Sequence, residues 1–275
     1  MKAGRVVIAA VMAAGMINAQ AQDQIVIDGS TTVGPIGKAF AEFFMKNNPG
    51  VNVTVSESGS GNGARGIVNN TIQVGMMSRF MRDTEFKACV DNGVTPVVHV
   101  VALDGLPVLV HPSNPVGDLT LEQVRKIYKG EITNWRQVGG PDMAIVFVSR
   151  DTNSGTYETF NEIVMQKEQI HGSAEYVGSN GAVRQRVQTT PAAIGYAGLG
   201  FVDETVKALK INGIEATERN IIAGDYPIAR ALYMFTNGYP KLGSNLYKLM
   251  TLHLTPEGEE IVKSIGFVPV TQYGF

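Results

Sequence analysis

The stretch IVIDGSTTVGP, residues 25–35, decides how the chain begins to fold. Ile25–Ile27 has the apolar pattern of a short strand, and Pro35 stands where a helix would begin, a position that favours proline. The polar loop Gly29–Thr32 lies between them. Glycine, serine and threonine at a helix start offer free backbone N–H groups, hydroxyl donors and the positive end of the helix dipole. The stretch therefore predicts a strand–loop–helix unit whose loop either caps the helix or binds an anion.

Two further loops have the same character. Ser58–Gly61 follows the alternating strand pattern of Val51–Val55, and Ser154–Thr156 follows the apolar run Ala144–Val148. Arg150 stands shortly before the last of these loops, and an arginine can hold two oxygens of a tetrahedral anion through parallel hydrogen bonds. A single loop of this kind is most simply a helix cap. Three of them with an arginine predict the wall of a pocket for a tetrahedral oxyanion.

The rest of the chain alternates between strand and helix patterns, which favours an α/β fold with mainly parallel sheets. We expect strands at 25–27, 51–55, 73–77, 97–103, 106–111, 144–148, 193–196, 207–211 and 228–235, and helices at 35–47, 64–69, 83–91, 120–128, 156–165, 179–188, 242–252 and 256–265. Parallel sheets bind ligands outside the carboxyl ends of their strands. Two sheets that face each other across a cleft would bring all three loops onto one ligand.

The N-terminus has the features of a secretory signal peptide, residues 1–21. Lys2 and Arg5 precede a mostly apolar run, and Ala19-Gln20-Ala21 supplies small residues for cleavage before Gln22. The apolar run is too short to span a bilayer, which needs about 20 apolar residues. The single cysteine, Cys89, lies far from this segment and offers no lipid attachment there. We therefore expect an exported protein of the periplasm that is not inserted in the membrane.

Composition excludes several classes of function. The chain has 23 basic and 25 acidic residues, and loss of residues 1–21 would leave 21 basic against 25 acidic. A slightly acidic protein does not suggest nucleic-acid binding. The sequence contains no H-E-x-x-H, G-x-x-x-x-G-K-[ST] or G-x-S-x-G motif, and its four histidines are scattered. We expect no enzyme activity, no metal and no cofactor.

One stretch permits a different interpretation. Residues 61–66 match the dinucleotide fingerprint G-x-G-x-x-G between a strand and a helix. Arg79, after the next strand, would suit a 2′-phosphate. The periplasm lacks a free nicotinamide pool, however, and the fingerprint usually lies in the first strand–helix unit. The same loop, with Ser60 at its edge, serves equally well as an anion cradle.

The chain resembles the periplasmic phosphate-binding proteins that serve the high-affinity phosphate ABC transporter. Besides the three loops, the resemblance rests on VGMMSR (74–79), ALDG (102–105), ITNW (132–135), IGY (194–196), YPIAR (226–230) and GFVP (266–269). It implies a type II periplasmic-binding-protein fold, with two α/β lobes joined by two hinge strands. Lobe 1 would hold residues 23–103 and 228–275, and lobe 2 residues 106–226.

The resemblance also implies the ligand, the partner and the binding residues. Inorganic phosphate would be delivered to the permease subunits of the transporter by a monomeric receptor. The residues expected at the phosphate are Ser30, Thr31, Thr32, Ser60, Ser78, Arg79, Asp104, Arg150, Ser154, Gly155 and Thr156. A receptor for another oxyanion, such as sulfate or molybdate, and a secreted phosphatase remain as alternatives.

One departure from the family pattern bears on selectivity. Some members carry an aspartate after the third strand that accepts a hydrogen bond from protonated phosphate and so rejects sulfate. This chain has Ser78 at that position, followed by Arg79. Asp104 is the first candidate for a replacement carboxylate, with Asp151 and Glu158 behind it, although Asp104 could instead be a simple turn residue.

Overall fold

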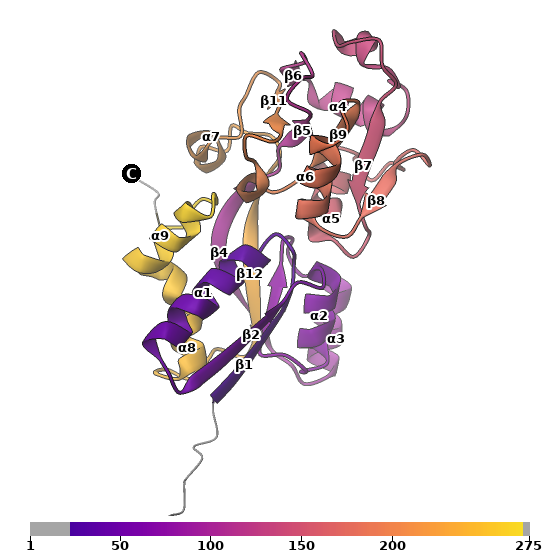
Figure 1. Cartoon of the computed structure of the whole chain (residues 1–275). Helices are drawn as coiled ribbons and strands as arrows, with labels where there is room; N and C mark the ends of the chain where they lie inside the picture. The colour runs from indigo at the N-terminus through magenta and orange to yellow at the C-terminus, as the bar shows by residue number, and fades with distance from the viewer. Residues whose placement is uncertain (1–22, 272–275) are drawn as a thin grey trace, which may run out of the picture.

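The protein has two lobes, one above the other in Figure 1, and each is built around a five-stranded sheet. The computed structural model describes residues 23–271, so the predicted signal peptide lies outside the described residues. We call the lobe that contains the first strand lobe 1 and the other lobe 2. Among residues 23–271, no helix combines the length and the apolar character needed to cross a bilayer.

The lobe 1 sheet has the strand order β2-β1-β3-β12-β4. Its strands are β1 (Asp23–Gly29), β2 (Val51–Ser56), β3 (Val74–Met77), β4 (Pro96–Gly105) and β12 (Ala229–Asn237). β1 pairs in parallel with both β2 and β3, in a register that places Gly29 beside Met76. The carboxyl ends of these three strands therefore lie along one edge of the sheet, where the first two polar loops begin.

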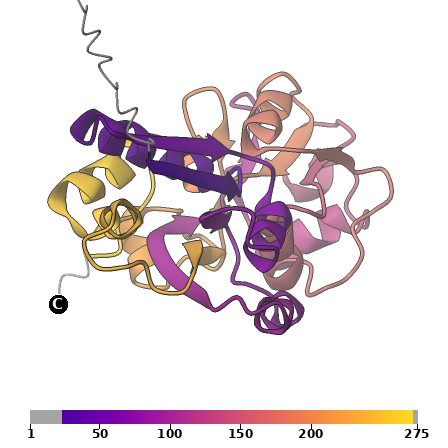
Figure 2. The same cartoon turned by 90° about the horizontal axis from the view of Figure 1, so that it is seen from below.

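Helices cover both faces of the lobe 1 sheet. They are α1 (Gly34–Asn47), α2 (Ser60–Val68), α3 (Asp83–Asp91), α8 (Asn245–Met250) and α9 (Pro256–Ser264), with the short helix η3 (Leu252–Leu254) between the last two. α1 packs with α8 and α9 on one side, and α2 packs with α3 on the other (Figure 2). Ile36, Phe40 and Phe44 recur every four residues on α1 and are buried, so this helix presents one apolar face to the sheet.

The second helix begins earlier than its sequence predicts. We expected a helix at 64–69, but α2 begins at Ser60, directly after Gly59, whose φ is +103°. Glycine is a poor helix former, yet Gly63 lies so close to β3 that a Cβ there would be 2.7 Å from the Met76 carbonyl oxygen. Close packing of the helix on the sheet outweighs the low propensity, and it places Ser60 in the first helical turn.

The lobe 2 sheet has the strand order β10-β5-β9-β7-β8. Its strands are β5 (Val108–Val110), β7 (Val146–Arg150), β8 (Glu175–Val177), β9 (Ala193–Tyr196) and β10 (Lys207–Ala208). The helices are α4 (Leu121–Tyr128), α5 (Gly155–Ile163), α6 (Asn180–Gln188) and α7 (Glu218–Ile222), with the short helices η1 (Trp135–Val138) and η2 (Leu199–Phe201). Apolar clusters lie on both faces of this sheet, and Trp135, Tyr128 and Phe160 belong to the larger one.

The expected strand at 207–211 is divided between two sheets. β10 pairs with β5 in the main sheet, whereas β11 (Lys210–Ile211) pairs with β6 (Asp118–Leu119) in a separate two-stranded sheet. Leu209, between the two short strands, is buried. The apolar pattern is continuous, but the chain changes hydrogen-bonding partner in the middle of it.

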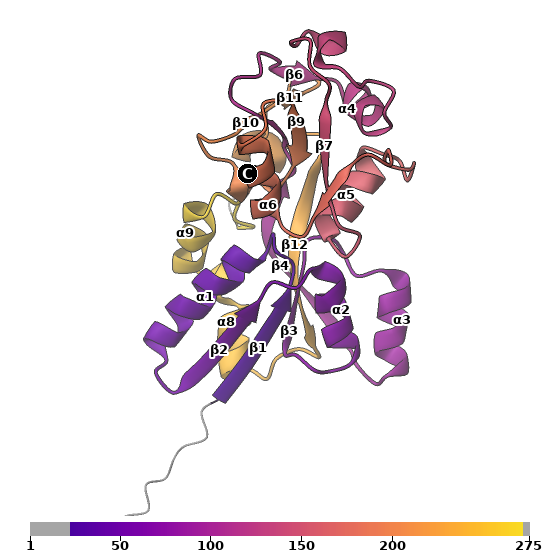
Figure 3. The same cartoon turned by 45° about the vertical axis from the view of Figure 1, so that its right-hand side comes forward.

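The chain crosses between the lobes along β4 and β12, which lie side by side at the centre of the molecule (Figures 1 and 3). β4 leads out of lobe 1 and β12 leads back, so the two strands are antiparallel, with Arg230 opposite Asp104. Mixed sheets are confirmed. Each five-stranded sheet has two parallel and two antiparallel pairings, and the two-stranded sheet adds a parallel one, so five of the nine strand pairings within residues 23–271 are parallel.

Candidate anion-binding site

The three polar loops meet between the lobes, where the N-terminal ends of α1 and α2 face that of α5 (Figure 3). The hydroxyl oxygens of Thr32 in lobe 1 and Thr156 in lobe 2 are 2.9 Å apart. A Cβ on Gly155 would lie 2.7 Å from Ser60 Oγ and 2.8 Å from Ser78 Oγ. Only glycine therefore fits at this point of contact between the lobes.

The loop after β1 supplies one wall of the site. The Ser30 N–H donates to the Met76 carbonyl at 2.9 Å, which ties the loop to β3. Ser30 Oγ accepts hydrogen bonds from the N–H groups of Thr32 and Val33, at 3.1 and 3.3 Å. Ser30 thus holds the turn before α1, whose N-cap Val33 offers no side-chain acceptor, and the hydroxyls of Thr31 and Thr32 remain for other partners.

Ser60 and Ser78 form the second part of the lobe 1 wall. Each is only 1% exposed. The Ser78 N–H donates to Ser60 Oγ at 3.1 Å, and the two hydroxyl oxygens are 3.3 Å apart. This contact joins the end of β3 to the first turn of α2 and buries both hydroxyls next to Gly155.

The start of α5 supplies the lobe 2 wall. Ser154 is the N-cap, and its Oγ accepts the Tyr157 N–H at 3.3 Å. Gly155 and Thr156 occupy the first helical turn, where backbone N–H groups have no acceptor within the helix. All three predicted residues of this loop are buried. The end of the helix therefore directs N–H groups and its positive dipole end toward lobe 1.

Arg150, at the end of β7, is 1% exposed. Its Nε donates to the Val177 carbonyl at 3.1 Å and its Nη2 to the Gly178 carbonyl at 2.9 Å. Its Nη1 is buried and has no hydrogen-bond partner within residues 23–271. Burial lowers the pKa of Arg150 to about 10. The guanidinium is thus fixed from behind by neutral carbonyls and retains a free donor for an anion.

Arg79 has a different environment. Its Nη1 and Nη2 pair with the two carboxylate oxygens of Glu85, at 2.8 and 2.7 Å. Its Nε donates to Glu158 on α5, also at 2.7 Å. The charge of Arg79 is already met by two carboxylates, so we leave this predicted residue out of the anion site and assign it to contact between the lobes.

Asp104 is fully buried at the end of β4. Its Oδ1 accepts the Leu199 N–H at 2.8 Å, and its Oδ2 accepts two N–H groups of Arg230, at 3.0 and 2.8 Å. Burial raises the pKa of Asp104, against the opposing effect of Arg230. Asp104 is therefore more than a turn residue, because it holds a buried arginine in place.

The other two carboxylates that we considered are also engaged. Asp151 Oδ1 accepts the Asn153 N–H at 2.9 Å. Glu158 binds Arg79 and, through both of its oxygens, Arg82. Glu158 is therefore paired with two arginines, whereas the second oxygen of Asp151 lies 3.8 Å from Arg150 Nη2.

Sequence reasoning missed two buried residues of the site, Asn180 and Arg230. Arg230 Nη2 donates to Thr156 Oγ1 at 3.0 Å, and Nη1 donates to the Ser78 carbonyl at 3.1 Å. Asn180 Nδ2 donates to the hydroxyls of Thr31 and Thr32, at 3.1 and 2.9 Å. The Ser-Asn-Gly run at the start of α6 resembles the other polar helix starts and could have pointed to Asn180.

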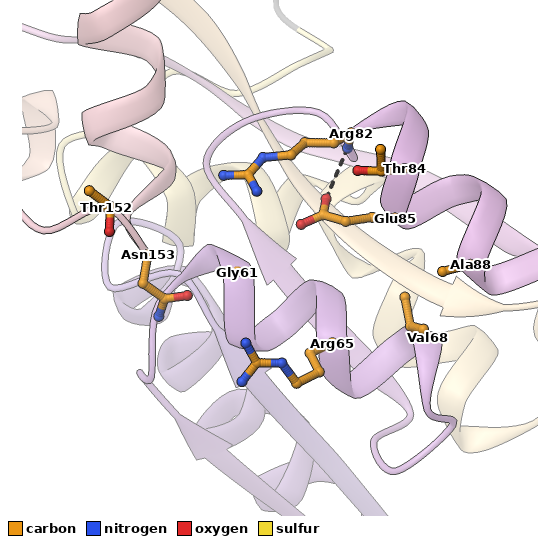
Figure 4. A pocket seen from close by; sticks show the side chains of 9 residues that line it. All are labelled: Gly61, Arg65, Val68, Arg82, Thr84, Glu85, Ala88, Thr152 and Asn153. Atoms are coloured by element: carbon orange, nitrogen blue, oxygen red, sulfur yellow. Dashed lines mark hydrogen bonds between the residues drawn. The ribbon is translucent and has the colours of Figure 1, made fainter. Parts of the chain in front are cut away.

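A groove of about 330 Å³ opens at the edge of the site, between α2, α3 and the Thr152–Asn153 turn (Figure 4). Asn153 faces α2 there, and a Cβ on Gly61 would lie 2.2 Å from Asn153 Oδ1. The Gly61 N–H donates to the Asn153 carbonyl at 3.1 Å. Gly61 and Gly63 of the apparent dinucleotide fingerprint therefore allow close contact with lobe 2 and with β3, and this packing accounts for both glycines without a nucleotide.

Among residues 23–271, no three histidine, cysteine, aspartate or glutamate side chains lie close enough together to hold a metal ion. The groups that converge on the site are hydroxyls, backbone amides and a guanidinium. All of them can donate hydrogen bonds, as an oxyanion requires.

Comparisons with known proteins agree with this chemistry. A family model described as a PBP superfamily domain matches residues 15–250. The phosphate-binding protein PstS of Bacillus subtilis is 33% identical over 261 residues, which cover 92% of this chain and 82% of that protein. The PstS protein of Borreliella burgdorferi is 30% identical over 269 residues, which cover 93% and 94% of the two chains.

Solved structures show the same similarity. A phosphate ABC transporter substrate-binding protein from Clostridium perfringens, with bound phosphate, superposes with a TM-score of 0.83 at 34% identity, covering 90% of this chain and all of that one. An ABC-type phosphate transport receptor from Vibrio cholerae superposes with a TM-score of 0.72 at 29% identity, covering 89% and 99% of the two chains.

Proposed function

Because this chain belongs to the family of phosphate-binding proteins that serve ABC transporters, we propose that it captures inorganic phosphate in the cleft between its lobes. The members of this family are transport receptors and not enzymes. The observation that carries the proposal is the buried, donor-rich junction around Arg150 and Thr156.

We assign the ligand contacts to buried residues of the three polar loops, together with Ser78 and Arg150. They are Ser30, Thr31, Thr32, Ser60, Ser78, Arg150, Ser154, Gly155 and Thr156. Transfer of an anion out of water is costly unless hydrogen bonds replace its hydration shell. Backbone N–H groups, hydroxyls and the Arg150 guanidinium would supply these bonds, and bonds to a charged partner are about twice as strong as those between neutral groups.

We propose that the lobes divide at residues 104–105 and near residue 227, so that residues 23–103 with 228–275 move against residues 106–226. The hydroxyl contact between Thr32 and Thr156 would form only on closure. An anion that touches both walls favours the closed form by its higher affinity for that form.

We further propose that the protein works in the periplasm as a monomer, after cleavage of residues 1–21, and delivers phosphate to the permease subunits of the transporter. This assignment is supported by family membership and by the signal-peptide pattern of the N-terminus.

Calorimetric titration of the ligand-stripped mature protein with phosphate, and then with sulfate, tests the proposed function. We expect tight binding of phosphate. Binding of sulfate alone would make the protein a receptor for another oxyanion, and binding of neither anion would overturn the assignment. Turnover of a chromogenic phosphate ester would revive the phosphatase alternative.

A single substitution tests the assigned site. Thr156→Val keeps the shape of the side chain but removes a hydroxyl at the junction. We expect phosphate affinity to fall about tenfold or more, because a hydrogen bond to a charged partner contributes about 1.5–3 kcal/mol. Unchanged affinity in this variant would remove Thr156 from the site. Thr189→Val, on the exposed end of α6, is the matched control.

A further inference from the structure

Asn180 is a buried amide at the first position of α6, and it contacts the opposite lobe. It is 0% exposed. Its Nδ2 reaches the hydroxyl oxygens of Thr31 and Thr32, at 3.1 and 2.9 Å, and its Oδ1 lies 3.2 Å from the Gly198 nitrogen. All of the polar atoms of this side chain therefore have partners.

These partners fix which way the amide faces. A backbone N–H can only donate, so the atom facing Gly198 must be the carbonyl oxygen of the amide. The two hydrogens on Nδ2 then point at Thr31 and Thr32, one to each hydroxyl. The reversed amide would place two donors against each other at Gly198 and leave a buried N–H unpaired, which is costly.

The orientation of the amide determines the orientation of the hydroxyls. Each threonine has a single O–H hydrogen, and its oxygen already accepts from Asn180. The hydrogens of Thr31 and Thr32 are consequently turned away from Asn180. Thr156 Oγ1, which accepts from Arg230 and lies 2.9 Å from Thr32 Oγ1, can donate the bond between the two hydroxyls, which leaves the Thr31 and Thr32 hydrogens for another acceptor. We propose that Asn180 is a positioning residue that sets these two hydroxyls as hydrogen-bond donors toward the bound oxyanion, an inference that rests on the proposed function.

This role differs from simple structural support. If Asn180 only held the Gly198 turn through its Oδ1, Asn180→Asp would be tolerated better than Asn180→Ala, because the aspartate retains the acceptor. If Asn180 orients the hydroxyls, Asn180→Asp should instead be tolerated less well than Asn180→Ala. Both carboxylate oxygens of an aspartate accept, so Thr31 and Thr32 would turn their hydrogens toward it and present lone pairs to the anion.

Calorimetric titration with inorganic phosphate separates the two roles. We expect Asn180→Ala to weaken affinity about tenfold and Asn180→Asp about 100-fold or more, since bonds to a charged partner are the strong ones. Asn114→Ala is the matched control: Asn114 is also a buried asparagine of lobe 2, and its Oδ1 accepts the Val116 N–H at 3.0 Å. The phosphate affinity of the Asn114→Ala variant should stay within about twofold of wild type.

A double-mutant cycle with Thr32→Val distinguishes hydroxyl orientation from charge repulsion by the aspartate. Without the Thr32 hydroxyl, the penalty of Asn180→Asp should shrink by at least about threefold, because residues that act through one contact are not additive. The proposal would be overturned if the losses of phosphate affinity were fully additive. It would also be overturned if Asn180→Ala bound phosphate more weakly than Asn180→Asp.

Two controls keep these outcomes interpretable. Circular dichroism checks that each variant folds, and if Asn180→Asp does not fold, the cycle between Asn180→Ala and Thr32→Val still tests the coupling. A wild-type protein that binds no phosphate would overturn the proposed function instead, and this result is distinguishable because it appears before any substitution is made.

Discussion

Arg79 and Arg150 stand in matching sequence contexts but in opposite electrostatic environments. Each follows a serine at the end of a buried strand, and each is almost fully buried. Arg79 is surrounded by the carboxylates of Glu85 and Glu158, at 2.7 Å from each. Arg150 is held by two backbone carbonyls and keeps one buried nitrogen without a partner in the described part of the chain.

The difference shows that a buried arginine is not by itself an anion site. A guanidinium matched by carboxylates is part of the scaffold, because its charge is compensated within the fold. The Arg150 guanidinium is hydrogen-bonded only to neutral carbonyls, and its nearest carboxylate oxygen, Asp151 Oδ2, is 3.8 Å away. Its charge is therefore less fully compensated than that of Arg79, and an incoming anion would relieve the cost of its burial. By this criterion we propose Arg150 for binding and Arg79 for the contact between the lobes.

The largest expected effect comes from removing Arg150. We expect Arg150→Ala to weaken phosphate affinity at least about 100-fold, since it removes a buried cationic group that keeps a donor without a partner among residues 23–271, and bonds to charged partners are worth about 1.5–3 kcal/mol each. Calorimetric titration measures this loss.

Arg79→Ala is the matched comparison. It leaves Glu85 and Glu158 without their shared cation, so we expect the free energy of unfolding to fall by about 3 kcal/mol. Its phosphate affinity should change less than that of Arg150→Ala. If the two variants lose affinity equally, the distinction between them is wrong.

Local sequence patterns are enough to predict the loops of the site. Gly29–Thr32, Ser58–Gly61 and Ser154–Thr156 are each contained between a strand and a helix, and the structure brings all three together. Arg150 was predicted because it is close to one of these loops in sequence. Mixed sheets and two lobes followed from the alternation of elements and from the family resemblance.

Contacts between distant segments could not be predicted in this way. The charge of Arg79 is matched by Glu158, which is 79 positions away in sequence. Asp104 likewise binds Arg230, which lies opposite it on the paired strand. Asn180 reaches Thr31 over a separation of 149 positions. Tertiary contacts decide which hydrogen-bond donors already have a partner within the protein. These contacts produce no periodic pattern in the sequence.

The pKa of Arg150 provides a second, smaller test of the comparison. Burial lowers this pKa to about 10, so the unbound protein loses the positive charge as the pH rises above that value. A bound anion favours the charged form and raises the pKa again. Binding is therefore coupled to proton uptake above about pH 10, and affinity should fall by up to about tenfold per pH unit.

Titration with phosphate at several pH values around and above 10 checks this expectation, since inorganic phosphate stays a dianion over the first part of that range. Arg150→Met, which has no titrating group at this position, should show a flatter profile. A wild-type profile as flat as that of Arg150→Met would mean that the charge of Arg150 does not contribute to binding.

The smallest expected effect concerns the carboxylate that joins Arg79 to the other lobe. Glu158, on α5, accepts Arg79 Nε and Arg82 Nη2, both at 2.7 Å, and its side chain is 16% exposed. This pairing also raises the pKa of Arg82. Because the two arginines belong to lobe 1 and the glutamate to lobe 2, the ion pairs favour the closed form without touching the anion.

We therefore expect Glu158→Gln to weaken phosphate affinity only about two- to fivefold, in line with about 0.2–1 kcal/mol for a partly exposed ion pair. Added salt screens such pairs, so the affinity of the variant should depend less on ionic strength than that of wild type. Glu218→Gln, at an exposed position on α7, is the control and should behave as wild type. A loss as large as that of Arg150→Ala would place Glu158 within the binding machinery itself, and the division between a binding arginine and a scaffold arginine would no longer hold.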